Sequence, residues 1–135
     1  MSDEIKCLID NHLDILSRII KSSEGILHLS KSCEIEELYR ETQNRDRLLN
    51  ILEEAQVKIQ KEIEDLQASQ IKKEVVDLIK NWQMKMNNQV ELISNIDEQI
   101  VDLLDCERTN ITKEISELYK KKQSFKGYNL KNVQR

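Results

Sequence analysis

The apolar residues of this chain recur in steps of three and four over residues 71–125, a stretch that contains no glycine and no proline. That spacing places them along one face of an α-helix. An unbroken helix of this length would extend roughly 80 Å, at about 1.5 Å per residue. The pattern therefore predicts one very long C-terminal helix, over residues 71–126, which is longer than a small globular core requires.

Two shorter apolar stripes come before it and predict helices over residues 3–29 and 33–67. The turns between the three helices are expected near residues 29–33 and 67–70, where small polar residues replace the apolar pattern. Gly25 lies in the last third of the first predicted helix, where it either weakens the helix or begins its end.

The stripe of the second predicted helix is interrupted between Arg40 and Arg47, where Thr42 and Arg45 occupy positions that the spacing assigns to apolar residues. One interpretation is that Arg45 lays its aliphatic stem along the helix contact and keeps its charged head in water. The other is a polar layer between helices, which disfavours incorrect helix pairings.

The composition agrees with an all-α protein. The chain has no proline, only two glycines, 34% charged residues and 4% aromatic residues among its 135 residues. Sheets and tight turns need more of the turn-forming residues, and so few aromatic side chains predict a thin aliphatic core. We expect a single helical domain over residues 1–135, folded as an antiparallel three-helix bundle or coiled coil.

The predicted C-terminal helix is longer than either of the first two predicted helices. If the chain reverses at residues 67–70, the first two helices can cover the third only as far as about Leu104. Residues 105–125 are patterned for burial but have no partner in a three-helix bundle. They either continue the long helix and offer their stripe to another chain, or kink near residues 106–110 and fold back as a fourth helix. Continuity is favoured because no glycine or proline enforces a break.

The end of the chain is basic. Seven Lys or Arg and two acidic residues lie from Lys113 to Arg135, a local charge of about +5, whereas the whole chain carries −4. Gly127 is expected to close the helix shortly after Phe125, leaving a basic tail over residues 127–135. The lysines suit the negative end of a helix dipole or an anionic protein surface. Nucleic acid is not an expected partner, because aromatic residues do not alternate with an arginine-rich run.

The sequence predicts no disulfide framework, no membrane insertion, no metal site and no catalytic centre. Cys7, Cys33 and Cys106 are an odd number without a CxxC pair, which is typical of reduced thiols in the cytoplasm. No signal peptide and no apolar run of about 18 residues is recognised, so membrane insertion is not expected. His12 and His28 lie too far apart to predict a metal site. Without a phosphate loop or a nucleophile beside a base, the sequence predicts a non-enzyme with no cofactor.

Two segments carry a resemblance to a known family. The acidic and arginine-rich segment from Glu36 to Leu52, and the segment from Asn95 to Tyr128 with its lysine-rich end, resemble flagellar export chaperones of the FliT type and, more loosely, FlgN. Residues 129–135 extend past the tyrosine-containing end that is usual in these proteins. The resemblance implies a cytoplasmic chaperone that binds a helical terminus of a filament-cap or hook-associated client and delivers it to the export apparatus.

In such families the C-terminal helix carries contacts with the client or the export gate. By position, the resemblance assigns these contacts to Ile111, Ile115, Leu118, Tyr119, Phe125, Tyr128 and Leu130. An amphipathic half-helix without a partner independently suits the recognition of another helix. The alternatives are a structural coiled-coil protein that forms a homodimer through its long helix, and a regulatory four-helix bundle that requires the kink near Cys106.

Overall fold

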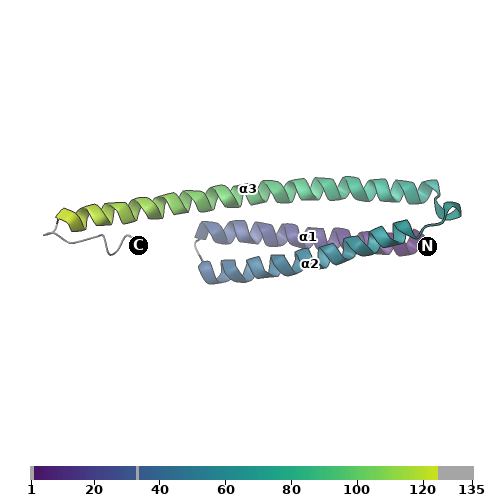
Figure 1. Cartoon of the computed structure of the whole chain (residues 1–135), viewed down its shortest axis with the longest axis horizontal. Coiled ribbons are helices and arrows are strands. Elements are labelled where there is room, and N and C mark those ends of the chain that lie inside the picture. Colours follow the sequence, from purple (N-terminus) through teal and green to yellow (C-terminus); the bar gives the residue numbers. More distant parts are fainter. Residues whose placement is uncertain (1, 33, 125–135) are drawn as a thin grey trace. The chain divides into compact units, whose positions relative to one another are not determined.

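Helices are the only regular secondary structure in the described part of the chain. The computed structural model describes residues 2–32 and 34–124, with the side chains of residues 2, 119 and 121–124 left out of that description. Its elements are helix α1 (Ser2–Ser32), helix α2 (Ile35–Glu64), a 3-10 turn η1 (Ala68–Gln70) and helix α3 (Lys73–Ser124) (Figure 1). The all-α prediction with one long C-terminal helix is confirmed. The chain divides into two compact units, Met1–Ile100 and Val101–Arg135.

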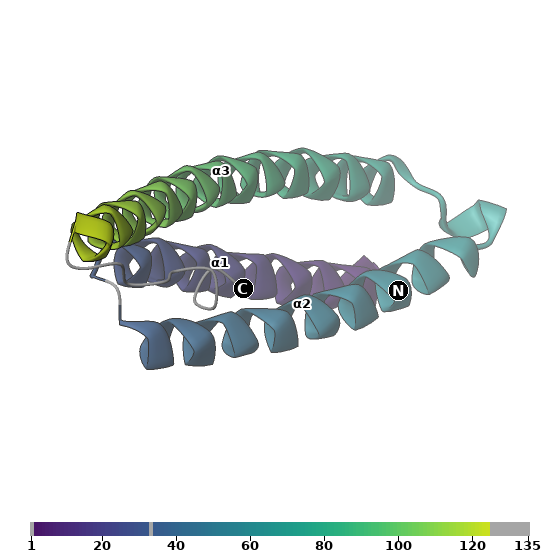
Figure 2. The same cartoon turned by 60° about the vertical axis from the view of Figure 1, so that its left-hand side comes forward.

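The first unit is a three-helix bundle. Helices α1 and α2 run antiparallel side by side, and the first part of α3 returns along them, parallel to α1 (Figures 1 and 2). Three groups of side chains form its core. The first group contains Ile5, Ile9, Ile59, Val75 and Trp82; the second contains Ile15, Ile19 and Ala55; the third contains Ile26, Ile96 and Ile100. The core is aliphatic apart from Trp82, as the composition indicates.

Helix α1 continues through Gly25 and ends at Ser32, about one turn later than the apolar stripe suggests. Burial explains the extension, because Ile26 and Ser30 are both buried beyond the glycine. The hydroxyl of Ser30 donates a hydrogen bond to the carbonyl oxygen of Ile26 at 2.7 Å, so this serine adds no unsatisfied polar group. Gly25 therefore does not begin the end of the helix, because packing against the neighbouring helices outweighs its weak helix propensity.

The connection between α2 and α3 spans residues 65–72 and contains η1. At its centre the backbone N–H of Gln67 donates to Oε1 of Gln70 at 3.0 Å, and the backbone N–H of Gln70 donates to the carbonyl oxygen of Gln67 at 2.8 Å. These bonds close the turn locally. Leu66 packs against the first core group and ties the connection to the bundle.

Helix α3 is continuous through residues 106–110, where a kink was the alternative. The side chain of Thr109 donates to the carbonyl oxygen of Asp105 at 2.9 Å, and that of Thr112 donates to the carbonyl oxygen of Arg108 at 2.9 Å. These hydroxyl groups bond back to the same helix and do not cap a new one. A fourth helix does not occur in the part of the chain that the structure describes.

Candidate docking surface on the last part of helix α3

The polar interruption of α2 lies at a contact with α3. The guanidinium of Arg45 donates two hydrogen bonds to the carboxylate of Asp97, 2.5 Å from Nη1 to Oδ1 and 2.8 Å from Nη2 to Oδ2. The hydrogen bond to Asp97 raises the pKa of Arg45 above its ordinary value. The Arg45 side chain is 18% exposed. The interpretation that its head lies free in water is therefore wrong, and the arrangement favours the polar layer.

A second polar contact joins α1 to α2 at the same end of the bundle. The hydroxyl of Ser22 donates to Oε1 of Glu41 at 2.7 Å. Gly25 lies one turn further along α1, where an added Cβ would meet the side chain of Glu41 at 3.7 Å. Small residues on α1 thus leave room for the Glu41 side chain between the two helices.

His12 is a structural residue of the bundle. Its side chain is completely buried, and its Nδ1 accepts a hydrogen bond from the indole Nε1–H of Trp82 at 3.1 Å. The two rings meet edge to face, with centroids 5.4 Å apart and an interplanar angle of 83°. Burial lowers the pKa of His12, so its neutral form, with the proton on Nε2, is the one the fold accommodates. His28, by contrast, is exposed.

The described residues form no recognisable centre for metal chemistry. Among them, no three His, Cys, Asp or Glu side chains lie close enough together to hold a metal ion. Cys7 and Cys106 are free and exposed. None of the described helical segments is both long and apolar enough to cross a membrane.

Four of the seven predicted contact residues, Ile111, Ile115, Leu118 and Tyr119, lie in the last part of α3. Ile111, Ile115 and Leu118 are 54%, 44% and 56% exposed. Tyr119 is within α3, but its side chain lies outside the described part of the structure. Phe125, Tyr128 and Leu130 also lie outside it, as do the expected cap at Gly127 and the basic tail. The structure therefore places three of the seven predicted residues on one helix face.

Two further residues extend this face to the beginning of the second unit. Val101 and Leu104 are 55% and 44% exposed, whereas Ile100 is buried in the third core group. We call Val101, Leu104, Ile111, Ile115 and Leu118 the distal stripe. Sequence reasoning assigned Leu104 to the core and missed Val101, because helix lengths alone place the end of the covered region only approximately. The signal that could have found them is helical spacing, because Leu104 lies seven residues before Ile111 and Val101 lies three residues before Leu104.

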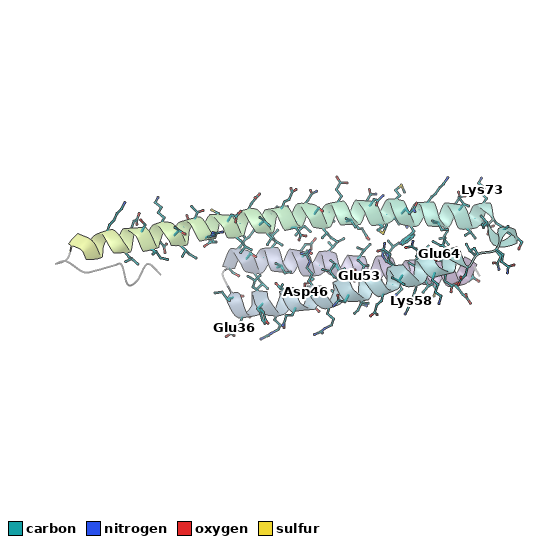
Figure 3. The ribbon with its side chains drawn as sticks, viewed as in Figure 1. Glu36, Asp46, Glu53, Lys58, Glu64 and Lys73 are labelled. Carbon is teal, nitrogen blue, oxygen red and sulfur yellow. The ribbon has the colours of Figure 1, made fainter. Side chains whose placement is uncertain are left out.

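Exposed apolar residues on α2 do not form a comparable surface. Ile35, Tyr39 and Val57 are 77%, 65% and 66% exposed, but no continuous apolar row connects them. Charged residues are spread along the same helix, among them the labelled Glu36, Asp46, Glu53, Lys58 and Glu64 (Figure 3). Single apolar residues on a charged surface are ordinary, whereas a continuous stripe indicates a binding site.

Comparisons of the chain with protein-family models, curated proteins and solved structures return no match. Its resemblance to flagellar export chaperones therefore depends on the sequence segments quoted above.

Proposed function

We propose that this protein is a non-catalytic export chaperone of the FliT type that acts in the cytoplasm. It binds a helical segment of a filament-cap or hook-associated client and presents that client to the export apparatus. No cofactor takes part. The observation that carries this proposal is the distal stripe, whose five apolar side chains are all 44–56% exposed on one face of a helix.

Leaving such an apolar surface in water costs free energy. Burying apolar surface contributes about 25 cal/mol per Å², and a row of aliphatic side chains at helical spacing is the surface that a second amphipathic helix covers. An aggregation-prone helical terminus has the complementary apolar face. Covering it in a one-to-one complex protects the client and the chaperone together.

Binding to a client peptide tests the proposal. A labelled peptide with the helical C-terminal sequence of a filament-cap protein is titrated with the full chain, and fluorescence anisotropy measures the dissociation constant. We expect Ile111→Ala together with Leu118→Ala to weaken binding by about tenfold or more, since a few buried apolar anchors carry most of the affinity of such interfaces.

The matched control removes equally exposed apolar side chains from α2. Ile35→Ala together with Val57→Ala should leave the dissociation constant unchanged. Circular dichroism should show that both double variants are folded. Retained binding in the α3 variant would contradict the proposal, and so would loss of its helical signal, because the two residues would then belong to a core.

The second candidate function is that of a structural coiled-coil protein whose distal stripe pairs with the distal stripe of a second copy. It predicts a concentration-dependent homodimer in sedimentation velocity, and the Ile111→Ala and Leu118→Ala changes would dissociate it.

A further inference from the structure

The distal stripe follows a heptad pattern. With Val101 at an a position, Ile115 is also at a, and Leu104, Ile111 and Leu118 are at d. One a position interrupts the apolar row, between Leu104 and Ile111. It is occupied by Arg108, whose side chain is exposed. The seam that a partner helix would cover therefore contains one cation among five aliphatic residues.

Between Val101 and Leu118, the positions that border this seam are acidic or neutral. Glu107 and Glu114 occupy the g positions, and Asp105 and Thr112 occupy the e positions. Lys113 and Lys120 are at f positions, on the opposite side of the helix from the seam, and Lys121 is at the g position that follows Leu118, the last residue of the distal stripe. Among the described residues, no ion pair involves the acidic residues of this border or Arg108.

From this arrangement we infer the chemistry of the helix that binds here. It is an amphipathic helix of a different protein, with an apolar seam, lysine or arginine at the positions that border the seam, and one carboxylate that faces Arg108. Basic side chains at its borders meet Asp105, Glu107 and Glu114, and the carboxylate compensates the cation in the seam. This inference rests on the proposed function, because it specifies the client helix.

A second copy of the chain fits the same surface poorly. In a parallel pair, the two Arg108 side chains would occupy the same layer of the interface. In an antiparallel pair that aligns Val101 with Leu118, the g positions face each other and bring Glu107 next to Glu114 of the other copy. Like charges at such positions destabilise helix pairing. Both arrangements therefore carry a repulsive contact that a basic client helix avoids.

Two synthetic helical peptides test the inference against the full chain. Both have the same aliphatic seam. The first has lysine at the border positions and glutamate opposite Arg108, and in the second these charges are exchanged. Isothermal titration calorimetry at low ionic strength should show that the first peptide binds about tenfold more tightly than the second. Exchanging the charges turns several modest attractive contacts into repulsive ones at the same time.

Two charge-reversal variants identify the residues responsible. Glu107→Lys together with Glu114→Lys should abolish or reverse the preference for the first peptide. The matched control is Asp102→Lys together with Glu117→Lys, which changes the net charge by the same amount at exposed positions away from the seam. This control variant should keep the preference. Equal loss of preference in both variants would overturn the inference, because overall charge would then explain it.

Other outcomes separate this inference from the proposed function. Equal affinity for the two peptides, with both interactions lost in Leu118→Ala, would overturn the charge specificity and leave the stripe as a docking surface. Binding of neither peptide would overturn the inference, while the client-peptide titration still decides the proposed function. A homodimer that Leu118→Ala dissociates would overturn both and identify a second copy as the occupant.

Discussion

Arg45 of α2 and Asp97 of α3, 52 residues apart in the chain, form a two-pronged ion pair between helices. It is the one ion pair between different helices in the described part of the structure, since the pair between Asp14 and Arg18 lies within α1. The pair is partly screened, because the Asp97 side chain is 39% exposed. The pair joins this turn of α2 to the turn of α3 that contains Asp97.

Removing one partner of this pair should destabilise the bundle. Asp97→Ala leaves the guanidinium of Arg45, which is 18% exposed, without its carboxylate. We expect the free energy of unfolding to fall by about 1–2 kcal/mol, a discounted value because water reaches the carboxylate. Urea denaturation followed by circular dichroism measures the change.

Replacing both partners should behave differently. Arg45→Met together with Asp97→Leu is expected to restore most of the stability, because no unpaired charge remains. If the pair also specifies helix register, the double variant will show broadened or duplicated amide signals by NMR. Simple additivity of the two single changes would indicate that the residues are not coupled.

Stability should decrease in mild acid because of His12. Burial lowers the pKa of the folded histidine below the ordinary value of 6.5, so below about pH 6.5 the unfolded chain takes up a proton that the folded chain does not. The contribution of neutral His12 to the free energy of unfolding is fully present above that pH and is lost as the pH falls toward the pKa of the folded state. The free energy of unfolding then changes by up to about 1.4 kcal/mol per pH unit. Urea denaturation at a series of pH values, followed by the fluorescence of Trp82, measures it.

Two variants separate the pH dependence of stability that His12 causes from the pH dependence that the carboxylates cause. His12→Asn keeps an acceptor near the indole N–H of Trp82 but cannot titrate, so its stability should change less between pH 7 and pH 5. His28→Gln changes an exposed histidine and should retain the pH dependence of the unaltered chain. Identical pH profiles for His12→Asn and the unaltered chain would contradict the assignment.

Alanine substitutions should separate the core from the distal stripe. Ile19 and Ile59 are completely buried, and alanine at either should cost about 3–4 kcal/mol through lost burial and the cavity left behind. Leu118→Ala, at a side chain that is 56% exposed, should cost less than about 1 kcal/mol. Thermal melting curves of the three variants measure the contrast, and a large shift for Leu118→Ala would place that residue in a core.

Gly25→Ala should stabilise the protein. The glycine lies inside α1, and an added Cβ would make an ordinary contact with the Glu41 side chain at 3.7 Å. Alanine lowers the entropy of the unfolded chain at a helical position, so we expect a gain of about 0.5–1 kcal/mol. A higher melting temperature would agree with this reasoning. A lower one would show that the Ser22–Glu41 contact cannot tolerate the methyl group.

Much of the fold could be predicted because helical periodicity is a local property. The spacing of Val75, Trp82, Ile96 and Ile100 predicts a buried face before any partner is known. The continuation of α3 past Thr109 also follows from the absence of glycine and proline. The end of α1 was harder to predict from the sequence, because the burial of Ile26 and Ser30 beyond Gly25 depends on the neighbouring helices.

The candidate site was predicted in part. Its helix and the residues Ile111, Ile115 and Leu118 follow from the sequence pattern, and the structure shows them exposed. The beginning of the distal stripe does not follow from it, since the burial of Ile100 depends on its packing with Ile26 and Ile96 in the third core group. The same apolar spacing continues on both sides of that point.

By itself, the sequence determined that the chain is helical, where its helices lie and which face of each is apolar. Only the tertiary structure decided which side chains meet across the bundle. His12 and Trp82 are 70 residues apart, and nothing in the spacing around either residue identifies the other. Burial, the lowered pKa of His12 and the pairing of Arg45 all depend on how the helices align, and alignment is set by the packing of all three helices together.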